Sequence, residues 1–217
     1  MATNRWRKYR VSALQLFSPV LAAALLLGAP PATADEVPKQ VAALLPAGFG
    51  VLTSARSMVG PRTFYFVALR SSREKDSRDY LTEAGPAPDR PLLIFELRPD
   101  GRVVLVGRND KVVDTADGAG LRGQGCDPFE DGHISVKGPF FTVENGVACG
   151  GAHWTDFITF RFVPEAGGFV FDNERFQSWK LNPSNDPDAE ALVRDTSKVW
   201  RATKIKPLAF SRWRPSN

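Results

Sequence analysis

The chain has 217 residues, of which 28 are Lys or Arg and 24 are Asp or Glu, so its formal net charge is +4. Its first 34 residues contain four basic residues and no acidic residue, which leaves residues 35–217 without net charge. This balance argues against nucleic-acid binding through a basic surface. Residues 35–217 are long enough for a single domain, which we expect to be monomeric.

The N-terminal segment, residues 1–34, is predicted to be a secretory signal peptide. Its four basic residues precede an apolar run over residues 11–27, and Ala-Thr-Ala at residues 32–34 forms a cleavage site before Asp35. A membrane anchor is the alternative, but Pro19 interrupts the apolar run, which falls short of the ~20 residues that a span needs. We therefore expect a soluble periplasmic or secreted protein with no transmembrane segment after cleavage.

The next part of the chain is predicted to form one short helix and four strands. The helix covers residues 38–45 and ends at Pro46. The strands are runs of β-branched, aromatic and other apolar residues at 48–52, 63–69, 91–97 and 102–106. Pro99-Asp100-Gly101 predicts a tight turn between the last two, because Pro and Gly supply the two turn conformations. The charged segment 71–90 is expected to be a long surface loop.

Two further hairpins are predicted after a glycine-rich loop at residues 114–125. Their strands are expected at 132–137 with 140–143, and at 157–163 with 168–171. In the second hairpin Ile158, Phe160 and Phe162 share one face, which we expect to face the core. The remaining predicted elements are a strand at 178–181, a turn at 182–188, a helical turn at 188–193 and an edge strand at 204–210.

This pattern predicts a mainly β fold, in which antiparallel hairpins form a small sandwich or a propeller-fragment-like sheet with one or two short helices. Residues 194–217 carry seven basic residues and one acidic residue, whereas residues 35–193 are acidic overall. The basic end is expected to dock on the acidic body; a free tail for anionic surfaces is the alternative. Residues 212–215 are expected to be loose, because chain ends fray.

A series of short motifs runs in a fixed order along the chain. They are Leu45-Pro46-Ala47-Gly48-Phe49, Arg90-Pro91-Leu92-Leu93, Arg108-Asn109-Asp110, Gly125-Cys126-Asp127-Pro128-Phe129, Gly150-Gly151-Ala152-His153-Trp154, Thr159-Phe160-Arg161 and Trp179-Lys180-Leu181. This order resembles a family of exported bacterial proteins of uncharacterised activity with an integrin-like, FG-GAP-related β pattern. Many members look as though they carry a calcium loop before the strand at 63–69. Residues 53–61 of this chain lack carboxylates, so the resemblance implies no calcium site here.

The two cysteines, Cys126 and Cys149, are predicted to form a disulfide, since export favours oxidation. If Lys137 and Phe140 flank a hairpin turn, the same register brings the cysteines within two residues of opposition. Closing this loop would stabilise the fold by roughly 3 kcal/mol. A zinc site that adds the only two histidines, His133 and His153, is the alternative, although the ligand spacing fits no paired-ligand knuckle.

The leading functional hypothesis is a non-enzymatic β module that binds an unknown protein or glycan of the cell envelope, with no cofactor and no metal. The side chains proposed to contact the ligand are Asp127, His153, Trp154 and Arg161. Trp154, next to two glycines, is the candidate for an exposed aromatic contact, whereas Trp179 is expected in the core. The alternative is an envelope hydrolase that uses Asp127, His153 and Asp156, although neither a Gly-x-Ser-x-Gly nor a His-Glu-x-x-His motif occurs in the sequence.

Overall fold

A computed structural model describes residues 37–81, 85–117, 125–130, 133–149, 152–184, 188–203 and 206–215. The predicted signal peptide and most of the glycine-rich loop lie outside these residues. The elements in chain order are α1 (Lys39–Ala42), β1 (Phe49–Val59), β2 (Arg62–Ser71), η1 (Ser77–Leu81), β3 (Arg90–Leu97), β4 (Val103–Val113), β5 (Ile134–Lys137), β6 (Phe140–Cys149), β7 (Ala152–Val163), η2 (Pro164–Ala166), β8 (Gly168–Leu181), β9 (Leu192–Arg201) and η3 (Phe210–Arg212).

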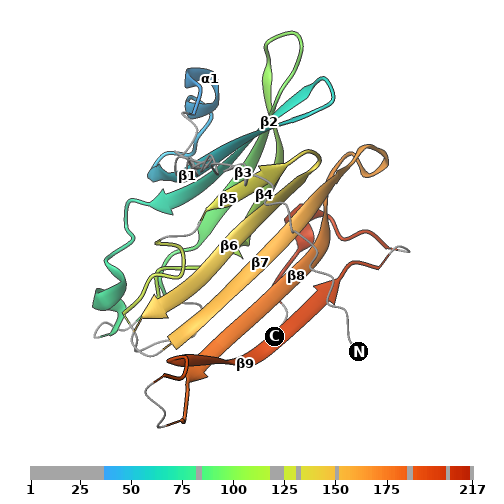
Figure 1. Ribbon diagram of the computed structural model, residues 1–217. Helices are drawn as coiled ribbons and strands as arrows, with labels where there is room; N and C mark the ends of the chain where they lie inside the picture. The colour runs from blue at the N-terminus through green and yellow to red at the C-terminus, as the bar shows by residue number, and fades with distance from the viewer. Residues whose placement is uncertain are drawn as a thin grey trace, which may run out of the picture. The chain divides into compact units, whose positions relative to one another are not determined.

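The strands form two antiparallel sheets, which confirms the predicted mainly β fold (Figure 1). Sheet 1 has the order β1-β2-β3-β4 and sheet 2 the order β5-β6-β7-β8-β9, so each strand pairs with its neighbour in sequence. The Pro-Asp-Gly turn forms as predicted between β3 and β4, where Gly101 has a φ of +80° and its N–H donates to the carbonyl of Arg98.

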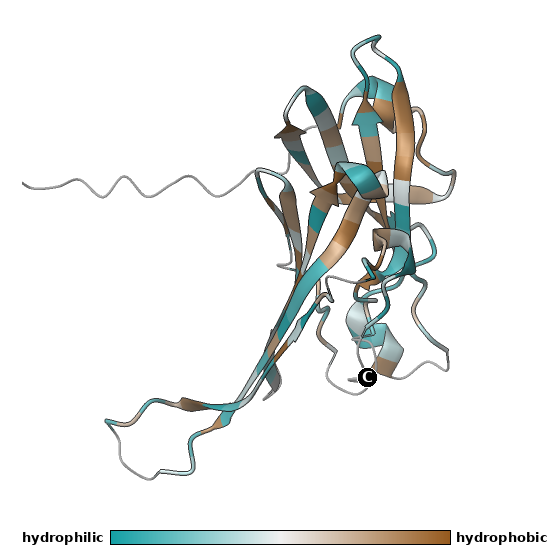
Figure 2. Ribbon diagram, turned by 90° about the vertical axis from the view of Figure 1, so that its right-hand side faces the viewer, coloured by the Kyte–Doolittle hydropathy of each residue, from teal (hydrophilic) through white to brown (hydrophobic). Residues whose placement is uncertain are grey.

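The two sheets pack as a small sandwich through a core that is unusually rich in phenylalanine. The ring of Phe66 in β2 lies 4.5 Å from that of Phe141 in β6, and Phe64 contacts Phe169 in β8 at 5.2 Å. The predicted core face of β7 is confirmed, because Ile158, Phe160 and Phe162 are all buried. Figure 2 shows the β8–β9 hairpin extending beyond the packed region.

The other face of sheet 1 is covered by the segment that contains α1. Val41 of this helix packs against Tyr65, Val67 and Leu69 of β2 in a second apolar cluster. The predicted helix at 38–45 is therefore present but shorter than expected, since only Lys39–Ala42 is helical.

Three expectations about secondary structure differ from the structure. The first strand, expected at 48–52, extends to Val59 in β1. The predicted helical turn at 188–193 is wrong, because Leu192 and Val193 begin strand β9. The segment 204–210 forms no strand among its described residues, and only a single bridge joins Ala209 to Val170.

The C-terminal segment docks on the body of the domain, as predicted. Phe210 is 3% exposed and Trp213 is 2% exposed, and both belong to the core between the sheets. The amide of Asn109 in β4 donates to the carbonyls of Phe210, at 2.5 Å, and Trp213, at 3.1 Å. The expectation of a loose end at 212–215 therefore needs correction at Trp213, whose burial anchors the segment.

Candidate functional site

Strand alternation gives sheet 2 an outer face that points away from the core. In β7 the core-facing residues are even-numbered, so His153, Thr155, Phe157 and Arg161 lie on the outer face. The pairing of β7, β8 and β9 continues this face across three strands: His153 lies opposite Trp179, and Phe157 lies opposite Arg175, which in turn pairs with Val199. We call this surface the outer face of β7–β9.

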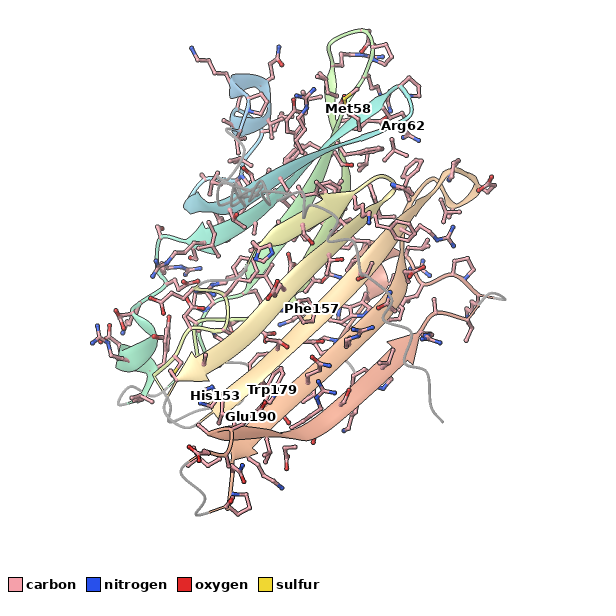
Figure 3. The ribbon with its side chains drawn as sticks, viewed as in Figure 1. Met58, Arg62, His153, Phe157, Trp179 and Glu190 are labelled. Atoms are coloured by element: carbon pink, nitrogen blue, oxygen red, sulfur yellow. A yellow bond between two sulfur atoms is a disulfide. The ribbon has the colours of Figure 1, made fainter. Side chains whose placement is uncertain are left out.

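One end of the outer face contains a hollow of about 340 Å³, which we call the tryptophan hollow. It is lined by Val147, Ala148, His153, Trp154, Thr155, Trp179 and Leu192. Figure 3 places His153 and Trp179 together here, with Glu190 beside them and Phe157 farther along the same face. The Thr155 hydroxyl and the Trp154 indole Nε1 are buried and make no hydrogen bond within the described residues.

Because Gly146 has no side chain, Thr155 can lie close to the backbone of β6. The two residues are paired across β6 and β7. A Cβ at Gly146 would lie 2.9 Å from the carbonyl oxygen of Trp154 and 3.2 Å from the Thr155 methyl. The absence of a side chain at Gly146 therefore permits this close approach of the two strands.

The other end of the outer face contains a second hollow, of about 400 Å³, which we call the arginine hollow. It is lined by Arg161, Asp172, Asn173, Arg175, Val199, Arg201, Ala202 and Thr203. Arg161 pairs with Asp172 at 3.5 Å, and the Asn173 amide also donates to Asp172, at 2.9 Å. Both hollows thus include outer-face residues of β7 and β8, and Val147 and Ala148 of β6 and the core-facing Trp154 also line the tryptophan hollow.

The core-facing side of β7 and β8 carries buried carboxyl groups where the two sheets diverge. Glu174 is 3% exposed, and Asp156 has one oxygen that is buried without a hydrogen bond from the described residues. Burial, followed by repulsion from Glu174 and Asp114, raises the pKa of Asp156 to about 8. Burial also raises the pKa of Asp114 to about 6, with Arg90 acting against the shift and Asp117 and Asp127 adding to it.

Asp127, one of the predicted ligand contacts, belongs to a mostly buried ion cluster around Arg90. The Arg90 side chain is fully buried, and its guanidinium donates to Glu74 at 2.7 and 2.9 Å and to Asp127 at 2.5 and 2.6 Å. A further bond of 3.0 Å goes to the carbonyl of Asp114. The bonds to Arg90 hold the loop that contains Asp127 against β3.

The structure confirms that the two predicted disulfide cysteines lie close together. Cys126 and Cys149 lie within disulfide-bonding distance, with their Cα atoms 6.4 Å apart. The hairpin register behind this prediction also holds, because Lys137 pairs with Phe140. The two histidines of the zinc alternative lie elsewhere: His133 approaches Glu144 at 3.2 Å, and His153 is on the outer face.

The remaining predicted site residues separate into two groups. His153 and Arg161 share the outer face of β7–β9. Trp154 is only 9% exposed and stacks on Phe176 with ring centroids 6.0 Å apart, so the expectation of an exposed ring was wrong. Trp179 is partly exposed and lines the tryptophan hollow, so the expectation that it belongs to the core was wrong.

The three residues of the hydrolase alternative, Asp127, His153 and Asp156, do not meet in one site. His153 and Asp156 are three residues apart on β7 and so point to opposite faces of sheet 2. Asp127 is bonded to Arg90.

Sequence reasoning missed Arg175, Arg201 and Glu174, which is buried and acts on the pKa of Asp156. Alternation along β8 could have placed Arg175 beside Phe157. Alternation could not have placed Arg201, because strand β9 was not predicted.

No protein-family model, curated protein or solved structure matches this chain. None of the helices in the described residues is long and apolar enough to cross a membrane.

Proposed function

We propose that this protein is an exported, non-enzymatic β-sandwich module that binds a glycan of the cell envelope through the outer face of β7–β9. The observation that carries the proposal is the tryptophan hollow, where Trp179, His153 and Thr155 line one cavity. An aromatic ring supplies an apolar platform for a sugar ring, and a few polar groups around it fix orientation.

The polar surface between the two hollows favours a glycan over a protein partner. Thr155, Gln177 and Ser197 are paired across the three strands; the Thr155 hydroxyl is buried, so this row offers the Gln177 amide and the Ser197 hydroxyl to a ligand. A stable protein interface has an apolar, fully buried centre, and this row provides none. Hydroxyl and amide groups instead match the hydrogen-bonding groups of a carbohydrate.

The length of the face supports an extended ligand. From the row at His153 to the row at Thr159 there are six residue steps along β7, or about 20 Å at the rise of a strand. A glycan chain lying along β7 would reach from the tryptophan hollow to the arginine hollow. The strands that carry both hollows are hydrogen-bonded in one sheet, which keeps the surface preorganised.

The test is binding of the exported protein to an array of bacterial envelope glycans, followed by calorimetric titration with the glycans that bind. We expect Trp179→Ala to weaken binding at least tenfold, because the aromatic platform is lost. Trp200→Ala is the matched control, since Trp200 pairs with Glu174 and therefore faces the opposite side of sheet 2. Equal binding by wild-type protein and Trp179→Ala would exclude the tryptophan hollow as the binding site.

A further inference from the structure

We infer that the arginine hollow is an anion-binding subsite, so that the ligand of the outer face is a glycan that carries carboxylate, sulfate or phosphate groups. This inference rests on the proposed function for the identity of the ligand as a glycan. The hollow itself is a separate feature of the surface, with its own residues and its own chemistry.

Positive charge exceeds negative charge in this hollow. Arg161, Arg175 and Arg201 all line it, and Asp172 is its single carboxylate. That carboxylate is occupied by Arg161 and by the Asn173 amide. Within the described part of the chain, neither Arg175 nor Arg201 makes an ion pair, and both side chains are exposed. Their guanidinium groups are thus available to a ligand.

The fold brings these arginines together from three different strands. In β8 the pairing with β7 shifts between Thr159–Asn173 and Phe160–Phe171, which makes Asp172 the extra residue of a bulge. The same residue accepts a hydrogen bond at 2.8 Å from the N–H of Ala202, where the chain leaves β9. The bulge therefore fixes both the carboxylate that holds Arg161 and the position at which Arg201 ends its strand.

The chemistry of the hollow selects an anion with several oxygen atoms. A guanidinium offers N–H donors in a planar fork that binds carboxylate, sulfate or phosphate oxygens in pairs. Converging arginines repel one another when no anion is present, and a bound anion removes that repulsion. The arginine hollow thus contributes charge recognition, and the tryptophan hollow about 20 Å away contributes the platform for a sugar ring.

The inference is tested by titrating three soluble polysaccharides into the exported protein: heparin, which is sulfated; alginate, which is carboxylated; and dextran, which is neutral. We expect heparin or alginate to bind more tightly than dextran, with an affinity that falls as salt increases. The double variant Arg175→Ala/Arg201→Ala should weaken binding of the anionic polysaccharide by about tenfold for each arginine removed, or about 1.4 kcal/mol each.

Two further variants make the result specific. Arg98→Ala removes an exposed arginine from the turn between β3 and β4 and should leave binding unchanged. Arg175→Lys retains the charge but loses the fork, so its affinity should fall between those of wild-type protein and Arg175→Ala. Thermal melting of each variant shows whether it is folded, and the exposed positions of these side chains predict that all of them are.

The two proposals fail in different ways. If the double arginine variant binds heparin and alginate like wild-type protein while Trp179→Ala loses binding, the anion subsite is wrong and the glycan-binding function stands. If the arginine variants lose binding and Trp179→Ala does not, the tryptophan hollow is no sugar platform and the proposed function fails. Tight binding to vesicles of anionic phospholipid or to inorganic phosphate, without binding to either anionic polysaccharide, would overturn the assignment of the ligand as a glycan.

Discussion

Arg90 of β3 holds Asp127 through a paired hydrogen bond. Both terminal nitrogens of its guanidinium donate to the carboxylate, at 2.6 and 2.5 Å. Arg90 begins β3 in sheet 1, and Asp127 directly follows Cys126. Burial opposes the charged form of Arg90, but the bonds to Asp127 and Glu74 raise its pKa above the ordinary value. The guanidinium therefore remains charged and holds the cysteine-bearing loop against sheet 1.

The first prediction concerns the removal of this cation. Arg90→Ala leaves Glu74, which is fully buried, and the mostly buried Asp127 without their shared partner. Breaking a buried ion pair from one side costs about 3–5 kcal/mol, so urea denaturation should show a loss of stability of that size. Arg102→Ala, which removes an exposed ion pair, serves as the control and should change stability by less than about 1 kcal/mol. A loss that small for Arg90→Ala would show that the cluster does not stabilise the fold.

The second prediction concerns the pH dependence of stability that arises from Asp156. Its folded pKa of about 8 lies above the ordinary value, so the folded protein retains a proton that the unfolded chain has already released. The stability associated with this proton is complete below about pH 4 and is lost progressively up to about pH 8.

Asp156→Asn removes this dependence, because an amide remains neutral at every pH in this range. The variant should be more stable than wild-type protein at pH 8.5 by about 1–3 kcal/mol, and the difference should shrink toward pH 5. Denaturant melts at several pH values measure this difference. Glu165→Gln, in the exposed β7–β8 turn, is the control and should show no such trend. A stability difference that is constant with pH would contradict the raised pKa.

The parts of the fold that were predicted correctly depend on local chemistry. The turn at Gly101 and the register of Lys137 with Phe140 follow from turn residues and strand alternation within a few positions. Strand β9 was missed because Arg194 and Lys198 carry charge onto opposite faces, so its sequence has no apolar alternation. An edge strand tolerates such a pattern because little of it is buried.

The candidate site was harder to predict because it depends on contacts between distant segments. His153 and Arg161 both lie on the outer face, whereas Trp154 is buried and Trp179, which was expected in the core, is partly exposed. Trp154 has the same parity along β7 as Ile158, and this alternation was a usable signal for its burial. In the Arg90 cluster the guanidinium bonds to a residue 37 positions away, and no local pattern indicates this contact.

The third prediction is that Cys126 and Cys149 are bonded to each other in the exported protein. Alkylation without reductant should label neither thiol, and the Cys126→Ala/Cys149→Ala variant should lose about 3 kcal/mol of stability for a sequence separation of 23 residues. Mass spectrometry of peptides prepared without reductant identifies the bond. Labelling of both cysteines, together with zinc at one ion per chain, would support the alternative metal site.

The fourth prediction is that residues 1–34 are a signal peptide that is removed after Ala34. The Ala-Thr-Ala site at residues 32–34 predicts that Asp35 is the first residue of the exported protein. Intact-mass analysis of protein from the periplasm or the medium measures this directly. Retention of residues 1–34 would leave four additional basic residues on the protein and contradict the charge balance on which the exclusion of nucleic-acid binding rests.

The last prediction concerns Trp213, which anchors the C-terminal segment. Its ring packs against Phe160 with centroids 6.1 Å apart, and its carbonyl accepts a hydrogen bond from Asn109. Trp213→Ala should reduce stability by about 3–5 kcal/mol, since it creates a cavity at the edge of the sandwich core. Arg212→Ala changes the exposed neighbour and should have almost no effect.

Chemical denaturation and binding of a hydrophobic dye measure this effect. Trp213→Ala should expose apolar surface on Phe160 and Phe171, both of which contact the Trp213 ring in the intact fold. If Trp213→Ala is as stable as wild-type protein and binds vesicles of anionic lipid more weakly, the C-terminal segment is a membrane-binding tail rather than part of the core. The burial of Trp213 and Phe210 against β7 predicts the opposite: a large loss of stability, because the apolar area that these side chains bury is part of what holds the two sheets together.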